Sequence, residues 1–329
     1  MKRSRLAVVS ILLMMAISAA VLSLSTGISA KASAANPPDA LQNIPSDYHF
    51  VSGINIRRLT ASSFYLKLQQ EQPQAAQLGG ALSKFTEQTG IDPARDISYL
   101  VMAGRSGEST KPEGLLIVSG EFDKNRITSF IRSKASPIEM EYGGTSVMMV
   151  PDKTDASVKN GMAFLGEHEI AMGALVSLKA ALDTRTGGKK NILSNAPISS
   201  LLGSINMDAM FWFVGDAAGA LRQSPLPIPP ALNASSIQSV AGAFDINEDI
   251  VGKITATTID SNAATKLVDV FRGILALGQV SGNQNPDIRL LLNTITVTQS
   301  AAQISLAINI PGDLIKKLGR TKGMPAGTI

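Results

Sequence analysis

The sequence predicts an α+β protein of two related lobes, each a mainly antiparallel sheet with helices packed on one face. Hydrophobic residues make up 44% of the chain and charged residues 17%, so the chain can bury a large core. Stretches in which apolar and polar residues alternate are separated by stretches with helical apolar spacing, which indicates strands interspersed with helices. The same order of strands and helices recurs in the second half of the chain.

The first 34 residues have the composition of an export signal. Lys2, Arg3 and Arg5 precede an apolar run over residues 6–24, and small residues follow at 32–34. A run of this length could instead remain attached as an uncleaved membrane anchor, and this segment is the only membrane contact that we expect. In either case we expect the body of the protein to be exported, and therefore periplasmic or extracellular.

The charge balance argues against a nucleic-acid partner. The whole chain carries 30 basic and 26 acidic residues. Residues 1–34 contain four basic residues and no acidic one, so a processed chain has no net charge. Nucleic-acid binding draws on clustered Lys and Arg, and we therefore expect none.

The chain contains no cysteine. This excludes disulfides, thiolate metal sites and a cysteine nucleophile. We expect the apolar core alone to hold the fold, without a cofactor or a metal.

Composition and patterning divide the chain into five segments. We expect a signal peptide or uncleaved anchor over 1–34, an extended linker over 35–45, lobe 1 over 46–190, lobe 2 over 191–318, and a disordered tail over 319–329.

The elements of lobe 1 follow from alternation and from turn residues. We expect strands at 48–56, 97–103, 115–122, 139–142 and 145–150, a hairpin around 166–168, and helices at 75–89, 124–131 and 175–182. Gly143 and Gly144 indicate a two-residue hairpin because both accept positive φ. Gly90 indicates a helix end, and Asp92 and Asp123 are placed as helix N-caps.

The elements of lobe 2 follow from the same signals. We expect strands at 210–214, 237–244, 252–259, 294–298 and 303–310, with helices ending at 221 and spanning 264–275, and a last helix after 310. Asp260 stands where an N-cap belongs, as Asp123 does in lobe 1. The sole tryptophan, Trp212, is expected in the core.

An internal duplication would explain the repeated order. Residues 47–50 align with 208–211, and residues 122–123 align with 259–260. The first six elements of each lobe, β-α-β-β-α-β, match the order of a ferredoxin-like split βαβ unit. The sequence thus predicts two lobes of that architecture.

Short motifs resemble those of a family of uncharacterised secreted bacterial proteins, known only as a domain of unknown function. They are the Pro-Ser-Asp47 entry to the first strand, the turn at 90–93, the strand-then-helix run over 114–130, and Tyr142-Gly143-Gly144. The resemblance covers most of the chain after residue 34. It implies no activity and no catalytic residue.

Catalytic patterns are missing from the sequence. It contains neither Gly-x-Ser-x-Gly nor Ser-x-x-Lys, and the loop over 104–110 lacks the Gly-Lys-Ser/Thr of a phosphate-binding loop. The only histidines, His49 and His168, fall in a strand and in a turn. We expect both to be structural, with no metal bound at 167–169, because neighbouring turn residues diverge.

The segment Pro225-Leu226-Pro227-Ile228-Pro229-Pro230 is the candidate interaction loop. Four prolines make it stiff and extended, so Leu226 and Ile228 must pack on the body of the protein or on a partner.

These observations favour a non-catalytic exported envelope protein that acts as a binding or interaction module, with an envelope protein or an apolar ligand as its partner. One alternative is an extracytoplasmic hydrolase whose site is assembled from scattered Ser, Asp and His residues. Another is a carrier that holds an apolar molecule between sheet and helices.

Overall fold

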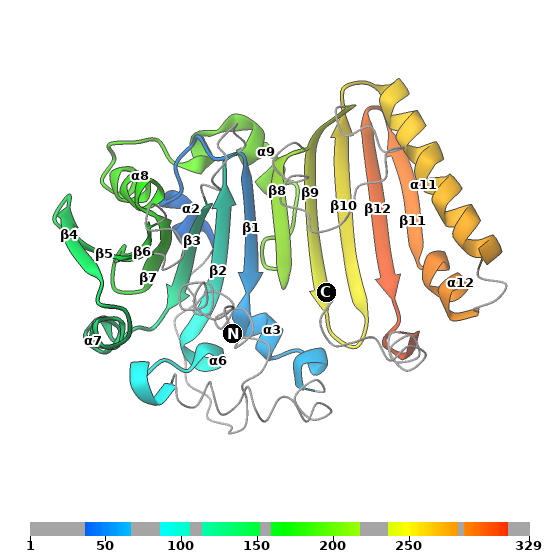
Figure 1. Ribbon diagram of the computed structural model, residues 1–329. Helices are drawn as coiled ribbons and strands as arrows, with labels where there is room; N and C mark the ends of the chain where they lie inside the picture. Colours follow the sequence, from blue (N-terminus) through cyan, green and yellow to red (C-terminus); the bar gives the residue numbers. More distant parts are fainter. Residues whose placement is uncertain are drawn as a thin grey trace. The chain divides into compact units, whose positions relative to one another are not determined.

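The chain is an α+β protein, as its sequence predicts. The computed structural model describes residues 37–66, 86–105, 114–151, 159–217, 236–281 and 286–314 (Figure 1). The chain divides into two compact units, residues 1–200 and 201–329. Each unit contains an antiparallel sheet and helices, and each is described on its own below.

The sheet of the first unit has every described pair of neighbouring strands antiparallel. Its strand order is β1-β2-β3-β7-β6-β5-β4. The strands are β1 (Phe50–Asn55), β2 (Ile97–Gly104), β3 (Gly114–Gly120), β4 (Ile138–Tyr142), β5 (Thr145–Pro151), β6 (Lys159–Phe164) and β7 (Glu169–Ala174). The central strands β2 and β3 are buried along nearly their whole length, as expected for strands covered on both faces.

Helices flank these strands. They are α2 (Pro37–Gln42), α3 (Ile56–Thr60), α6 (Pro93–Asp96), α7 (Lys124–Ala135) and α8 (Leu175–Arg185), followed by a short 3-10 turn, η1 (Ile192–Ser194). Asp92 caps α6 and Asp123 caps α7, as predicted, through bonds that their side chains accept from backbone N–H groups. Gly90 has φ +75° and ends the preceding helix, as predicted. Helix α9 (Ala196–Gly203) follows and contains the boundary between the units.

The sheet of the second unit has the strand order β8-β9-β10-β12-β11, again with antiparallel neighbours. Its strands are β8 (Phe211–Asp216), β9 (Ile237–Ile246), β10 (Ile250–Thr258), β11 (Ile295–Ser300) and β12 (Gln303–Ile310). Its helices are α11 (Ser261–Ser281), which lies along the β11 side of the sheet in Figure 1, and α12 (Pro286–Asn293). Trp212 is buried, with 1% of its surface exposed.

The two units share a pairing pattern. In each, three strands form an antiparallel meander, a helix follows, and the last strand of the sheet returns to pair with the third: β7 with β3, and β12 with β10. Phe50 and Phe211 begin the first strand of each meander, and Asp123 and Asp260 precede the helix. The first unit adds the hairpin β4-β5, and the second adds α12.

The ferredoxin-like split βαβ arrangement is wrong. That architecture places its first and third strands side by side and parallel, whereas β2 lies between β1 and β3 and pairs antiparallel with both. Element order is compatible with several pairings, and a meander satisfies the same order with local antiparallel contacts.

The extended linker expected over 35–45 is also wrong, because residues 37–42 form helix α2. Proline fits the first turn of a helix, where its missing N–H has no intrahelical partner to lose. Ala40, Leu41 and Ile44 are each at most 1% exposed, so this segment belongs to the core. Residues 1–34 and the tail over 319–329 lie outside the described residues, as does most of the helix expected at 75–89, of which the described residues 86–89 are helical. Among the described helices, none is long and apolar enough to cross a membrane.

Candidate functional site

Three features of the described residues bear on function: a pocket and a buried carboxyl group in the first unit, and an apolar sheet face in the second. The interaction loop predicted at Pro225–Pro230 lies outside the described residues, which end at Ala217 and resume at Ser236.

His168 lies in a turn, as the sequence predicts, whereas His49 lies just outside the strand in which it was expected. His49 directly precedes β1, and its backbone N–H donates to the Gly104 carbonyl over 3.0 Å. His168 is exposed in the turn between β6 and β7, where its Nδ1 lies 3.3 Å from Glu121 Oε2. In the ranges that the structure describes, no three His, Asp or Glu residues are grouped as metal ligands.

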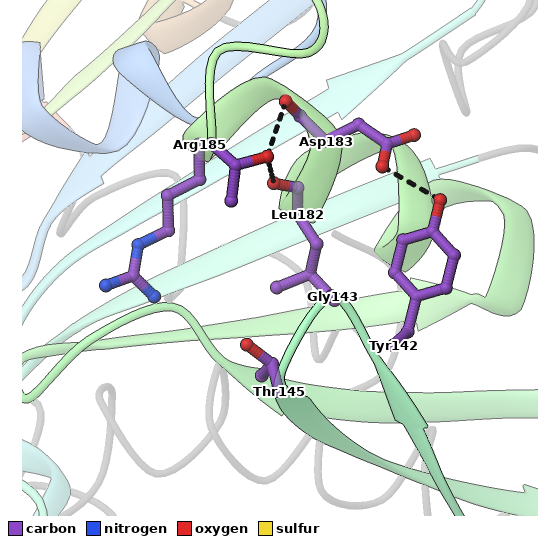
Figure 2. A pocket seen from close by; sticks show the side chains of 7 residues that line it. Tyr142, Gly143, Thr145, Leu182, Asp183 and Arg185 are labelled. Atoms are coloured by element: carbon purple, nitrogen blue, oxygen red, sulfur yellow. Dashed lines mark hydrogen bonds between the residues drawn. The ribbon is translucent and has the colours of Figure 1, made fainter.

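The pocket of the first unit lies between the tip of the β4-β5 hairpin and the last turn of α8 (Figure 2). Gly143 and Gly144 form the tip with φ +55° and +74°, so the predicted two-residue turn is confirmed. This turn brings Tyr142 and Thr145 to face the helix end. The pocket has a cavity volume of about 280 Å³.

Residues from two segments that are distant in sequence line this pocket. Helix α8 contributes Leu182, Asp183 and Arg185, and Thr186 follows its end. Tyr142 Oη donates to Asp183 Oδ1 over 2.8 Å, a bond visible in Figure 2. This bond to the carboxylate raises the pKa of Tyr142, so the phenol stays protonated and is a donor here rather than a base.

The buried carboxyl group belongs to Glu169, the first residue of β7. Asn43 Nδ2 donates to its Oε2 over 2.6 Å. Its Oε1 and the hydroxyl of Ser119, the residue paired with it across β3 and β7, are both buried. Burial first, and the charge of Asp39 second, raise the pKa of Glu169, while Arg185 and the Asn43 and Ser119 side chains oppose the rise.

The second unit has a continuous apolar sheet face. Strand register places side chains from all five strands on it, because paired residues share one face. We call these residues the apolar face: Phe211, Phe213, Val240, Gly242, Phe244, Ile246, Ile250, Gly252, Ile254, Ala256, Ile295, Val297, Ile304, Leu306, Ile308 and Ile310. The opposite face of β10, β11 and β12 carries mainly polar and small residues, including Lys253, Thr255, Thr296, Thr298, Ser305 and Asn309.

Two phenylalanine rings lie flat on the apolar face. A Cβ atom at Gly242 would lie 2.7 Å from Phe213 Cε1, and one at Gly252 would clash with the ring of Phe244. Each ring therefore covers the glycine paired with it on the neighbouring strand. The rings of Phe213 and Phe244 lie 6.4 Å apart at an interplanar angle of 16°, which makes this part of the face a flat aromatic surface.

Helix α11 packs on one part of the apolar face. Its Ala264, Leu267 and Val268 form a core cluster with Ile304, against which Val297 packs. Most other members of the face, from Phe213 to Ile310, are only half-buried. Ile274 of α11 and Leu290 of α12 are 43% and 47% exposed, so apolar surface continues onto both helices.

Sequence reasoning missed the pocket and the role of Glu169. Tyr142 and Asp183 are 41 residues apart, and no local pattern joins them. The signal for the apolar face was available, since residues 303–310 alternate between apolar and polar. The sequence does not show how these strands pair. Only the pairing register places the apolar residues of 303–310 on the same face as Phe213, Phe244 and Ile254.

Comparison with known proteins gives few matches. No family model matches the chain, and no curated protein matches it. Two crystal forms of a protein named TP0453 are similar. Form I is 9% identical with a TM-score of 0.47, covering 89% of this chain and 99% of that chain; form IV is 8% identical with a TM-score of 0.46, covering 84% and 95%. Identities this low give no information on ligand or activity.

Proposed function

We propose that this chain is a non-catalytic exported binding module of the cell envelope, and that its second unit holds an apolar ligand against the apolar face. The observation that carries the proposal is the continuous apolar face across β8 to β12, most of which is only half-buried. Contiguous apolar surface of this kind is uncommon on a soluble protein unless it binds something.

The shape of the face favours a hydrocarbon ligand. Gly242 and Gly252 remove side chains from the middle of the sheet, and the two rings over them form a flat surface. Such a surface offers dispersion contacts over a large area and no charged group. A lipid acyl chain has the length and the chemistry to lie along it, between the sheet and α11.

The described residues supply little for the hydrolase alternative. His168, one of its two candidate bases, is exposed beside Glu121. Tyr142 donates a hydrogen bond to the Asp183 carboxylate, and the residues that line this pocket include no histidine. The described residues instead provide an apolar surface in the second unit and a fixed hydrogen-bond donor, Tyr142, in the first. Both features suit a binding role.

The experiment is a fluorescence titration of the purified protein with a polyene fatty acid whose emission rises in an apolar site. Ile254→Asn places a polar amide on the apolar face, where its desolvation opposes binding. Thr255→Asn is the matched control, because the adjacent residue of the same strand points to the opposite face. We expect Ile254→Asn to weaken binding by about tenfold or more and Thr255→Asn to leave it unchanged.

Leu306→Asn provides a second variant on another strand of the same face, paired with Ile254. Circular dichroism of each variant separates loss of binding from loss of fold. Equal binding by folded Ile254→Asn, Leu306→Asn and the control would contradict the proposed function. Mass spectrometry of protein purified gently from its host envelope would identify the natural ligand, and sequencing its N-terminus would test processing after residue 34.

The predicted loop is a separate test of the interaction role. If Leu226 and Ile228 dock a partner, Leu226→Asp and Ile228→Asp abolish its capture from envelope fractions. Unchanged capture by both variants would remove the loop from the interface.

A further inference from the structure

The apolar face of the second unit has an aromatic half and an aliphatic half. Its phenylalanines, Phe211, Phe213 and Phe244, all lie on the neighbouring strands β8 and β9. The members of the face on β10, β12 and β11, which follow in that order in Figure 1, are aliphatic residues and Gly252. A ligand that matches this division has two chemically different parts.

Charge is confined to the other face of the same sheet. The charged residues of the five strands are Asp216, Asp245 and Lys253. Asp245 follows Phe244 and Lys253 follows Gly252, so both point away from the apolar face, and Asp216 does so by the same alternation from Phe213. The part of a ligand that lies on the apolar face is therefore uncharged, because no group there offsets the cost of burying a charge.

We propose that the ligand of the apolar face is a planar ring joined to a hydrocarbon chain. The ring stacks on Phe213 and Phe244, and the chain lies across Ile254, Leu306 and Ile308. This inference rests on the proposed function, because it names the class of ligand that the apolar face holds.

The two phenylalanine rings carry the assignment of a planar ring. Both lie against the sheet, each over a glycine of the next strand, with their centres 6.4 Å apart and an angle of 16° between their planes. They therefore present two ring faces side by side, and both side chains are only half-buried. Aromatic rings prefer offset stacking with centres about 4.5–7 Å apart. A planar ring placed over the pair can stack on both, whereas a puckered ring touches them with fewer atoms.

The aliphatic half continues directly from these rings. Strand pairing aligns one row of the face across all five strands: Phe213, Gly242, Ile254, Leu306 and Val297. Neighbouring strands lie about 4.8 Å apart, so the row spans roughly 19 Å, about half of it aliphatic. Its last member, Val297, packs against the core cluster of α11. A hydrocarbon chain that leaves the ring can follow this row toward α11.

The experiment compares three probes by their displacement of the polyene fatty acid from the full chain. In ω-naphthyldecanoate a planar ring ends the chain opposite the carboxylate, ω-decalinyldecanoate has the same carbon skeleton with a puckered ring, and decanoate has the chain alone. We expect the naphthyl probe to bind about fivefold or more tightly than the decalinyl probe, from stacking on two rings. We expect decanoate to bind most weakly.

The outcomes separate this inference from the proposed function. A naphthyl probe that binds no more tightly than the decalinyl probe would overturn the planar ring, while binding of the polyene would still support an apolar ligand. An absence of polyene binding would overturn the proposed function and this inference with it.

Variants locate the ring. The double variant Phe213→Leu with Phe244→Leu keeps the surface apolar and removes both ring faces, so the two ring probes should bind it equally. Leu306→Ala is the matched control, because it shortens a side chain of the aliphatic half and should weaken both ring probes by the same factor. Circular dichroism checks that each variant folds.

A preference for the naphthyl probe that persists in the folded double variant would overturn the assignment to these rings. Loss of the preference in Leu306→Ala would also contradict it, since the ring would then not be confined to the aromatic half. Where the double variant does not fold, Phe213→Leu alone should reduce the preference, and an unchanged preference there overturns the inference.

Discussion

Asn43 and Glu169 join the end of helix α2 to the sheet of the first unit. Asn43 follows α2, Glu169 begins β7, and the amide donates to the carboxyl group over 2.6 Å. The residues are 126 positions apart, so this bond closes a long loop of chain. Only 9% of Asn43 is exposed, and the contact lies where water has little access.

Glu169→Gln should make the protein more stable at neutral pH and flatten the dependence of its stability on pH. Burial raises the pKa of Glu169 above the ordinary value of 4.5, so the folded state binds the proton more tightly than the unfolded state. The stability that this proton contributes is therefore fully present when the pH lies below the ordinary pKa. It is lost as the pH rises through the pKa that Glu169 has in the folded protein. Glutamine keeps an acceptor for Asn43 and carries no charge to bury.

Urea denaturation of both proteins between about pH 4 and pH 7 measures this difference. The gap between the two free energies of unfolding should widen with rising pH. A gap that is constant over the whole range would show that the carboxyl group titrates normally.

Asp123→Ala and Asp260→Ala should each cost about 1 kcal/mol of stability. Asp123 Oδ1 accepts from the N–H groups of Asn125 and Arg126, and Asp260 Oδ1 accepts from that of Ala263 over 2.7 Å. These donors have no other partner in the first turn of a helix. Ligand binding should stay intact in both variants. A large loss of binding without loss of stability would reveal a functional carboxylate instead of a cap.

Arg132→Gln should raise the pKa of Glu139 toward its ordinary value without a measurable change in stability. In the unmodified protein, Arg132 donates two hydrogen bonds to the Glu139 carboxylate, over 2.6 and 2.8 Å, and these lower the pKa of Glu139. Both side chains are exposed, and solvent screens the pair. NMR titration of the Glu139 carboxyl measures the shift, and thermal unfolding checks stability.

Local signals predicted local structure well in this chain. The turn at Gly143 and Gly144, the end of a helix at Gly90 and the caps at Asp123 and Asp260 all depend on residues within four positions of one another. Each has a steric or hydrogen-bonding cause that acts on the backbone directly. These predictions needed no knowledge of the rest of the fold.

Pairing and site geometry depend on contacts across long distances in the sequence. The return of β7 to β3 follows the whole insertion of β4, β5 and β6, and turn residues carry no information about it. Glu169 stands next to an exposed turn in sequence, and its partner Asn43 lies 126 positions away. The segment over 37–42 was misread because proline favours both an extended chain and the first turn of a helix.

Gly252→Ala should destabilise the second unit by about 1–3 kcal/mol, the usual cost of overpacking. A methyl group at this position would collide with the ring of Phe244 and approach the Ala243 carbonyl oxygen to 2.8 Å. The ring can move only by leaving the flat arrangement in which it lies 6.4 Å from Phe213. Fluorescence of Trp212, the sole tryptophan, follows the unfolding of this unit.

A double-mutant cycle with Phe244→Leu tests the cause. If the ring is the obstacle, Gly252→Ala costs less in the Phe244→Leu background, and the coupling energy is about 0.5 kcal/mol or more. Gly203→Ala is a matched control, since a Cβ there meets no atom within 4 Å. Equal costs of Gly252→Ala in both backgrounds would place the strain at the Ala243 carbonyl, and the flat aromatic surface would then not depend on glycine beneath Phe244.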